Sequence, residues 1–244
     1  MAPSLYVYDT ALVAAARPRP QTIADVLAVM HTIDATCVDG DGLKWFNWLY
    51  LQVTQAVEAR VNAGGFTNAA WLVELDVQFA SLYFGALAVS LSGQPAPACW
   101  QALFSCRNHP MVARIQFALA GINAHINHDL PEALVATCKV TGIEPEHGSA
   151  EYADYTALNS TLDDLIDLAK KTLHVRLLGD ALPPASRLED TLAAFSVSAA
   201  REAAWQNAEL LWHLRNQPAL ADNFMTTLDG LTTLANKALL VPVA

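Results

Sequence analysis

The chain has 244 residues, of which 53% are hydrophobic and only 16% are charged, against about 25% charged in an average soluble domain. Its formal net charge is −10, and the pI of the sequence is about 5.0. An acidic surface disfavours nucleic acids and anionic membranes as main partners, because basic surfaces bind both. The length and apolar content predict a single domain over residues 1–244.

The most apolar stretch is FASLYFGALAVSLSG at residues 79–93. It is shorter than the roughly 18 uninterrupted apolar residues of a membrane-spanning helix and contains three serines. The first 20 residues lack the basic start of a secretory signal and carry Asp9 inside their apolar part. We therefore expect a cytoplasmic protein with an irregular segment over residues 1–20.

The apolar spacing is helical along nearly the whole chain, and no stretch alternates as a strand does. The predicted helices, with boundaries accurate to about 2–4 residues, span 21–36, 43–63, 69–92, 97–107, 111–130, 132–141, 149–178, 187–216 and 218–240. Stretches rich in glycine and proline separate them, such as DGDG and SGQPAP. We predict an all-α fold, a single-domain orthogonal bundle of about eight or nine helices.

The cysteine spacing and the motifs of the sequence disfavour several classes of cofactor. The four cysteines, Cys37, Cys99, Cys106 and Cys138, form no C-x-x-C pair, which disfavours a thiolate zinc site and favours reduced, buried thiols. The sequence has no Gly-rich phosphate loop, no G-x-S-x-G elbow and no H-E-x-x-H motif. We therefore expect neither a nucleotide nor a flavin.

Asp76 stands out in the helix predicted over 69–92 because it lies on the apolar side. Its neighbours on that side are Leu72, Phe79, Ala80, Tyr83 and Leu87, whereas Glu74, Gln78, Ser81 and Gly85 form the wetter face. A buried carboxylate costs several kcal/mol unless it is paired, hydrogen-bonded or bound to metal. Asp76 is thus a candidate catalytic residue and Tyr83 a candidate substrate contact. A structural bond from Asp76 to a tyrosine, an arginine or a helix end is the alternative. Asn47 and Tyr50 are further pocket candidates.

The stretch AGINAHINHDLPEAL, residues 120–134, carries unusual polarity for an apolar helix. At 100° per residue, Gly121, His125, His128 and Asp129 fall within about a quarter of the circumference. A second polar strip, formed by Gln116, Asn123 and Asn127, lies beyond an apolar stripe of Ile115, Leu119, Ile122 and Ile126. One core face and one solvated face do not require two polar strips, so at least one strip should face a cavity or a buried network.

The spacing of these residues suggests their roles. His125 and Asp129 are four residues apart, which suits two ligands of one metal or a histidine oriented by a carboxylate. His128 is the candidate general acid or base, and Asn123 and Asn127 are candidate substrate contacts. We expect Pro131 to end this helix and Gly121 to admit a close neighbour. The alternative is a solvent-exposed His125–Asp129 pair on an ordinary helix.

A third group lies in REAAWQNAELLWHL, residues 201–214. Glu202, Gln206, Glu209 and His213 share one stripe, beside Trp205 and Trp212. Glu209 is a candidate metal ligand, since bundles build metal sites from inward carboxylates and imidazoles, and Trp205 is a candidate substrate contact. Arg201 is a candidate catalytic residue that would clamp an anionic group or neutralise Asp76. A solvated helix face is the alternative. The histidines expected to be structural are His31, His109, His147 and His174.

The segments LDVQFASLYFGAL, RIQFALAGINAHINHDLPEALVATC and SAAREAAWQNAELLW together resemble a bacterial family of uncharacterised helical proteins, catalogued as a domain of unknown function. The resemblance extends from about residue 23 to residue 240, with N-A-H-I-N-H-D-L-P as its central signature. It implies the helical fold and the single-domain extent, and it brings no established activity. Members of such families often look like tailoring enzymes of specialised metabolism, which is an association.

The residues from Gly121 to Asp129 are also similar to the G-x-x-x-H-x-x-x-D helix of zinc-dependent phospholipases C and single-strand nucleases. That resemblance implies that His125 and Asp129 are zinc ligands. It covers one helix, and this chain has no second H-x-x-x-D motif. It therefore implies one or two divalent metal ions, with zinc first, rather than a three-zinc cluster.

Three functions remain open from the sequence. The first is a metal-dependent hydrolase of small-molecule metabolism, with His125, Asp129 and Glu209 as ligands. The second is a metal-free cyclase, isomerase or lyase that uses histidine and aspartate as acid and base on a largely apolar substrate. The third is a binding or scaffold protein without enzymatic activity. The expected partner is a small molecule rather than a nucleic acid or a membrane, and a homodimer is left open.

Overall fold

The computed structural model describes residues 6–173 and 196–242 of the chain. These residues contain no strand, so the predicted all-α class is confirmed. The helices are α1 (Asp9–Ala16), α2 (Ile23–Thr36), α3 (Gly42–Asn62), α4 (Ala69–Leu91), α5 (Ala98–Phe104), α6 (Arg114–Ala124), the π-turn η1 (His125–Asp129), α7 (Leu130–Thr141), α8 (Ala150–Thr156), α9 (Asn159–Thr172), α11 (Val197–His213) and α12 (Pro218–Leu239).

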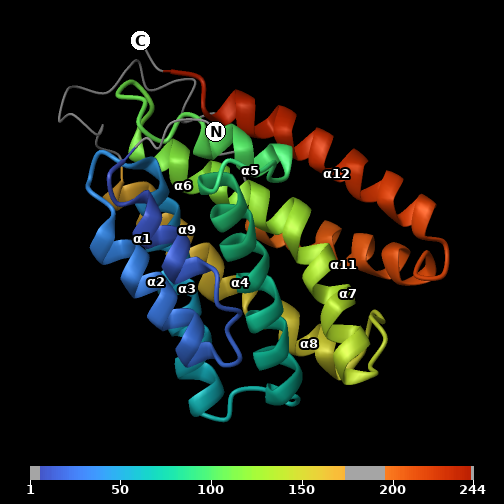
Figure 1. The fold of residues 1–244 in the computed structure, drawn as a ribbon. Coiled ribbons are helices and arrows are strands. Elements are labelled where there is room, and N and C mark those ends of the chain that lie inside the picture. Colours follow the sequence, from blue (N-terminus) through green and yellow to red (C-terminus); the bar gives the residue numbers. More distant parts are fainter. Residues whose placement is uncertain (1–5, 174–195, 243–244) are drawn as a thin grey trace.

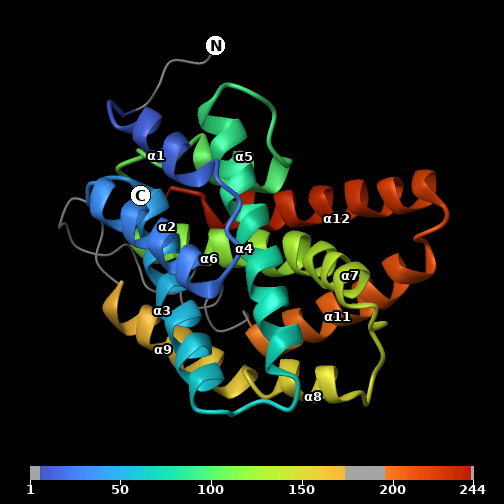
Figure 2. The same ribbon diagram turned by 60° about the horizontal axis from the view of Figure 1, so that its bottom comes forward.

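The helix formed by α6, η1 and α7 runs through the centre of the fold. Helix α3 packs on α6, α4 and α11 pack on α7, and α12 packs on α5 and α6. Every residue from Ile115 to Ala124 is buried, so α6 has no solvated face. Figures 1 and 2 show α12 crossing α4 steeply, which fits the predicted bundle of crossing helices. This central helix carries the polar strips that the sequence singled out.

Helix α1 lies inside the segment that the sequence predicted to be irregular. Leu12 and Ala16 are buried against the core, and α1 packs on α2 and α4. Asp9 starts the helix and pairs with the fully buried guanidinium of Arg107, 98 residues further along the chain. Because this partner is so distant in sequence, local patterns did not indicate the helix.

The helix predicted over 149–178 is described as far as residue 173, and that part forms two helices, α8 and α9, which meet at Ala157 and Leu158. The Ala157 carbonyl accepts a hydrogen bond from Arg60 Nη1 of α3 at 2.6 Å, so a tertiary contact satisfies a carbonyl at the break. Helix α11 is described from Val197 onward. The predicted start of its helix at residue 187 lies outside the described residues, as does His174.

Helix α4 is the one helix among the described residues that is long and apolar enough to span a membrane. Its best window has a mean hydropathy of 1.4, enough for a membrane-spanning helix, and 61% of that window is buried inside the fold. A central helix of a soluble protein has the same properties, because its side chains face other helices instead of lipid.

Candidate functional site

The chain passes from α6 to α7 through the π-turn η1, in which the Leu130 N–H donates to the His125 carbonyl five residues earlier. Proline has no N–H to donate, and in a regular α-helix its ring presses against the carbonyl four residues before it. The wider turn relieves this clash, so Pro131 lies in the first turn of α7 and does not end the helix as predicted. π-Turns of this kind are frequent at functional sites.

Asp129 is the centre of a buried polar network. The carboxylate is 2% exposed and accepts three hydrogen bonds: Trp100 Nε1 and His125 Nδ1 each lie 2.9 Å from Oδ2, and His128 Nδ1 lies 2.7 Å from Oδ1. Burial raises the pKa of Asp129, but the hydrogen bonds from the two histidines outweigh it and hold the pKa below its usual value. The alternative of a solvent-exposed pair is therefore wrong.

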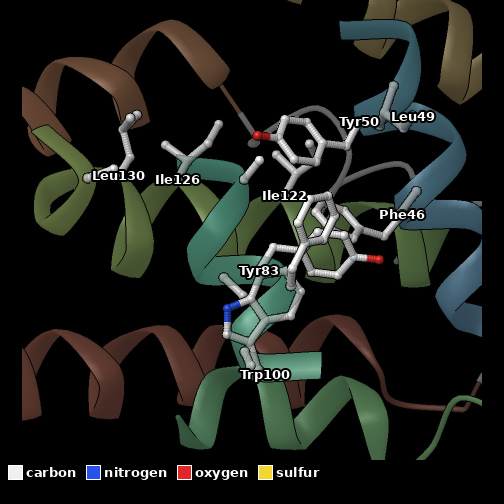
Figure 3. Packing of buried hydrophobic residues seen from close by; sticks show 14 of the residues in the cluster. Phe46, Leu49, Tyr50, Tyr83, Trp100, Ile122, Ile126 and Leu130 are labelled. Carbon is white, nitrogen blue, oxygen red and sulfur yellow. The ribbon is translucent and has the colours of Figure 1, made fainter. Parts of the chain in front are cut away.

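His125 is enclosed by aromatic rings. Its ring centroid lies 3.4 Å from that of Phe79, which is stacked on it, and 4.5 Å from that of Tyr50. Three further rings surround it, those of Phe46, Tyr83 and Trp100, and Figure 3 shows how these three and Tyr50 gather at the core. Burial lowers the pKa of His125, and its Nε2 has no hydrogen-bond partner among the described residues. The imidazole is thus neutral, with Nδ1–H on Asp129 and a lone pair on Nε2.

Gly121 makes this enclosure possible, although its close neighbour is protein and not ligand. A Cβ at this position would overlap the Phe46 ring. The sequence prediction of a close approach is confirmed, and the occupant is one of the rings that surround His125.

A cavity of about 50 Å³ lies between α3, α4, α9 and α11, open on one side. Most of its lining is apolar: Val53, Val57, Leu72, Leu75, Phe79, Leu130, Leu158 and Leu162. Three polar residues share this lining, Tyr50, Asp76 and Arg201. An apolar lining with a few polar groups is typical of small-molecule sites, although most of these are larger, at roughly 300–1,000 Å³. Phe79 and Tyr50 also separate the cavity from His125.

Asp76 lines the cavity without a hydrogen bond to any described residue. It is 8% exposed, and its Oδ2 is buried and unpartnered. Burial, with a smaller contribution from the charge of Glu58, raises the pKa of Asp76 to about 7. The Tyr50 hydroxyl is also buried, with the Thr54 hydroxyl and the Asp76 carboxylate as polar neighbours, and burial raises its pKa well above the usual value. The structural bond that was the alternative for Asp76 is absent among the described residues.

Arg201 brings a buried cation to the same cavity. Its Nε donates to Asn159 Oδ1 at 2.8 Å, its Nη2 donates to the Tyr155 carbonyl at 2.7 Å, and the guanidinium lies over the Tyr155 ring. It forms no ion pair with Asp76 or with another carboxylate in the part of the chain that the structure describes. Burial lowers the pKa of Arg201. The charge of Asp163 also acts on Arg201, but from beyond ion-pair distance. A buried cation without a direct carboxylate partner favours an anionic or strongly polar ligand group beside it.

The predicted metal set of His125, Asp129 and Glu209 is not brought together. Among the described residues, one group of histidine, cysteine and acidic side chains has its ligand atoms within 4.8 Å of one another: Cys99, His128 and Asp229. Of these three residues, the sequence indicated only His128, as a candidate general acid or base and not as a metal ligand. Cys99 and Asp229 were missed because no local spacing links residues 130 positions apart.

The other predicted substrate contacts lie in the protein interior. Asn127 Nδ2 donates to Asn123 Oδ1, and Asn123 Nδ2 donates to Asn236 Oδ1 and to the Thr232 carbonyl of α12. This second polar strip is thus a buried network, as predicted. Neither asparagine lines the cavity described above, and neither does Tyr83 or Trp205, which are both fully buried among aromatic side chains.

Glu209 belongs to a separate cluster on the surface. His147 Nδ1 lies 2.6 Å from Glu209 Oε1, and its Nε2 lies 2.9 Å from Glu202 Oε1. Trp205 Nε1 also donates to Glu209, and the Tyr152 hydroxyl donates to Glu202. The sequence left His147 without a carboxylate partner, because its two partners are 55 and 62 residues away.

Comparison with known proteins identifies a family of unknown function. A model described as a family of unknown function, DUF5995, matches residues 23–242. The chain belongs to the DUF5995 family. No curated protein and no solved structure matches the chain. Membership of DUF5995 confirms the uncharacterised family that the sequence resembles, whereas the one-helix likeness to zinc-dependent enzymes stays a prediction.

Proposed function

We propose that this DUF5995 protein is an enzyme of small-molecule metabolism that moves a proton within the cavity between α3, α4, α9 and α11. The observation that carries the proposal is the Asp76 carboxylate, which is buried in an apolar lining without a hydrogen bond to any described residue, in a cavity that Arg201 also lines. Burying an unpaired carboxylate is costly, and such groups are retained mainly where they act on a ligand. This corresponds to the metal-free isomerase, lyase or cyclase that the sequence allowed.

Each polar group has a distinct role in this proposal. Arg201 holds an anionic or carbonyl oxygen of the substrate, because its guanidinium is fixed by Asn159 and Tyr155 and has no carboxylate partner among the described residues. Asp76 takes or returns the proton, since a pKa near the working pH is best for a general acid or base. The Tyr50 hydroxyl donates to the oxygen on which charge develops.

The size of the cavity limits what it can hold. About 50 Å³ accommodates the reacting end of a molecule, and the open side lets an apolar remainder extend outward. The lining of leucines, valines and Phe79 favours a hydrocarbon chain or ring over a sugar or a nucleotide. A largely apolar molecule with one carbonyl or carboxylate group fits this description.

Metal-dependent hydrolysis, the first expectation from the sequence, is the second candidate. It is favoured by the Cys99, His128 and Asp229 group and not by the residues of the original prediction. His125 Nδ1 donates a hydrogen bond to Asp129 Oδ2, so these two atoms hold each other and not a metal ion. Assignment to specialised metabolism and a cytoplasmic location stay predictions.

The test uses a panel of small apolar oxo acids and carboxylic acids in D₂O, followed by ligand-observed NMR. We expect saturable binding and exchange of a C–H proton for deuterium with the wild-type protein. Asp76→Asn should keep binding and lose exchange by about 10²-fold or more. Arg201→Lys should weaken binding by about tenfold, because one ammonium replaces a fork of donors.

Glu74→Gln is the matched control, since Glu74 lies on the same helix outside the cavity lining. It should leave binding and exchange unchanged. Binding without exchange by the wild-type protein would make the cavity a ligand-binding site of a non-enzymatic protein. No binding of any acid in the panel would contradict the proposal, and circular dichroism of each variant separates this result from misfolding.

A further inference from the structure

A second group of reactive side chains lies away from the cavity and has no part in the proposed proton transfer. Cys99 lies in the first turn of α5, His128 lies in the π-turn, and Asp229 lies on α12. One ligand atom from each residue lies within 4.8 Å of the other two. A sulfur, an imidazole nitrogen and a carboxylate oxygen are therefore gathered from three separate segments.

His128 is prepared to bind through one nitrogen. The residue is 7% exposed, and its Nδ1 is held by Asp129 Oδ1 at 2.7 Å. Its Nε2 makes no hydrogen bond in the part of the chain that the structure describes. A histidine whose one ring nitrogen donates to a carboxylate, with the other nitrogen free, is the usual arrangement of a metal-binding imidazole and its supporting group.

Backbone contacts fix the other two groups. Asp229 accepts hydrogen bonds from the Ala98 and Cys99 N–H groups, each at 2.9 Å, which holds its carboxylate beside Cys99. Asn236 Nδ2 of α12 donates to the Cys99 carbonyl at 2.9 Å. The Cys99 thiol also hydrogen-bonds to Asp229, so a cation bound by both groups would displace this thiol proton to solvent. The Cys99 thiol is fully buried and is not in a disulfide.

We propose that Cys99, His128 and Asp229 bind one divalent transition-metal ion, with zinc as the preferred ion. Thiolate and imidazole ligands favour zinc over magnesium and calcium, which take oxygen ligands. Three protein ligands leave one position of a tetrahedral ion for water. The ion links α5, η1 and α12, so its first consequence is to brace the π-turn against the C-terminal helix. Asp129 is a positioning residue that acts through His128.

The site does not depend on the cavity chemistry, because the two share no residue. It also differs from the ligand set of the sequence prediction, which assigned the metal to His125, Asp129 and Glu209. The absence of a C-x-x-C pair does not exclude it, since only one ligand is a cysteine and the fold supplies the others.

Cobalt titration of tag-free, metal-stripped full-length protein tests the proposal without any substrate. We expect one Co²⁺ per chain, with a thiolate-to-cobalt charge-transfer band and the visible bands of a tetrahedral ion, displaced by Zn²⁺. Cys99→Ser should abolish the charge-transfer band, and His128→Gln should weaken binding by at least 10²-fold. Asp129→Asn should weaken it by about 10–100-fold while keeping the stoichiometry and the band, as expected for a supporting residue.

Cys138→Ser is the matched control, because Cys138 is another buried free cysteine that lies outside the group. It and Asp76→Asn should keep wild-type titrations. Failure of the cavity experiment would leave these results unchanged, so the two proposals fail separately. A wild-type protein without a charge-transfer band, or a band that survives in folded Cys99→Ser, would overturn the metal site.

Discussion

Two histidines three residues apart share one carboxylate and occupy different environments. His125 donates to Asp129 from inside a cage of aromatic rings, where burial lowers its pKa. Burial also acts to lower the pKa of His128, but the hydrogen bond to Asp129 and the nearby carboxylates outweigh it, so the pKa of His128 is raised. The difference arises from what lies beyond Asp129 on each side and not from the local sequence.

This comparison divides the centre of the molecule into two halves. On the His125 side, aromatic rings lead to an apolar cavity that contains Asp76 and Arg201. On the His128 side, Cys99 and Asp229 form a compact group of metal-binding atoms. Asp129 lies between the two halves and orients the imidazole on each side of it.

Removing Asp129 should have the largest effect, because it breaks both halves at once. Asp129→Ala leaves the Trp100, His125 and His128 donors without their acceptor in the core. We expect a loss of roughly 3–5 kcal/mol in the free energy of unfolding, measured by urea denaturation. Asp129→Asn keeps one acceptor oxygen and should lose less. Equal stability of Asp129→Ala and wild type would show that the network does not hold the π-turn.

The pH dependence of stability tests the cavity half of this comparison, because Asp76 titrates there. Its pKa is about 7 in the folded protein and near 3.8 when unfolded. The groups that interact with its charge are Glu58 and Tyr50, and Arg201 lines the same cavity. Between these values the folded state keeps a proton that the unfolded state releases, so Asp76 lowers stability as pH rises from about 4 to 7. The loss is on the order of 4 kcal/mol.

Asp76→Asn should remove this decline, so that the variant gains on the wild type as pH rises through the same window. Urea denaturation of both proteins at intervals of pH measures the difference. Glu58→Gln should reduce the decline slightly, because the negative charge of Glu58 contributes to the raised pKa. Parallel stability curves for wild type and Asp76→Asn would show that Asp76 titrates normally.

Gly121 and Gly85 form a matched pair of helix glycines that tests packing on the His125 side alone. A Cβ at Gly121 would overlap the Phe46 ring, whereas a Cβ at Gly85 would meet open space. We expect Gly121→Ala to cost roughly 1–3 kcal/mol in thermal or urea unfolding, because the core is overpacked. Gly85→Ala should gain about 0.5–1 kcal/mol from helix propensity. The same sign for both substitutions would contradict the close contact with Phe46.

The fold was predictable because helical periodicity is local. The predicted ranges 69–92 and 218–240 agree with α4 and α12, and capping residues such as Thr22 and Asn68 lie where the helices start. The errors occur where distant partners override local signals. Arg107 stabilises α1 through Asp9, and Arg60 satisfies a carbonyl at the break between α8 and α9. Pro131 was expected to end the helix, but the π-turn before it allows the helix to continue as α7.

The site was predictable to the extent that it lies on one helix. Two polar strips on an apolar helix indicated a buried network, and His125, His128 and Asp129 form one. Contacts between different helices leave no regular spacing in the sequence. It therefore could not predict that Asp76 and Arg201 line one cavity, or that His128 lies near Cys99 and Asp229. It grouped Glu209 with His125 because carboxylates and histidines recur four residues apart, although the histidine that Glu209 meets is His147.

His147 is the exposed counterpart of the two buried histidines and should show the smallest effect. It also contacts two carboxylates, those of Glu202 and Glu209, and these hydrogen bonds raise its pKa. Stability from the charged form is present below its unfolded pKa near 6.5 and is lost as pH rises through the higher folded pKa. We expect this contribution to be below about 1 kcal/mol and to fall in high salt, because water and ions screen exposed pairs. Thermal unfolding of His147→Gln and wild type should therefore differ more at pH 6 than at pH 9. A difference as large as that of Asp129→Ala would mean that burial is not what separates these histidines.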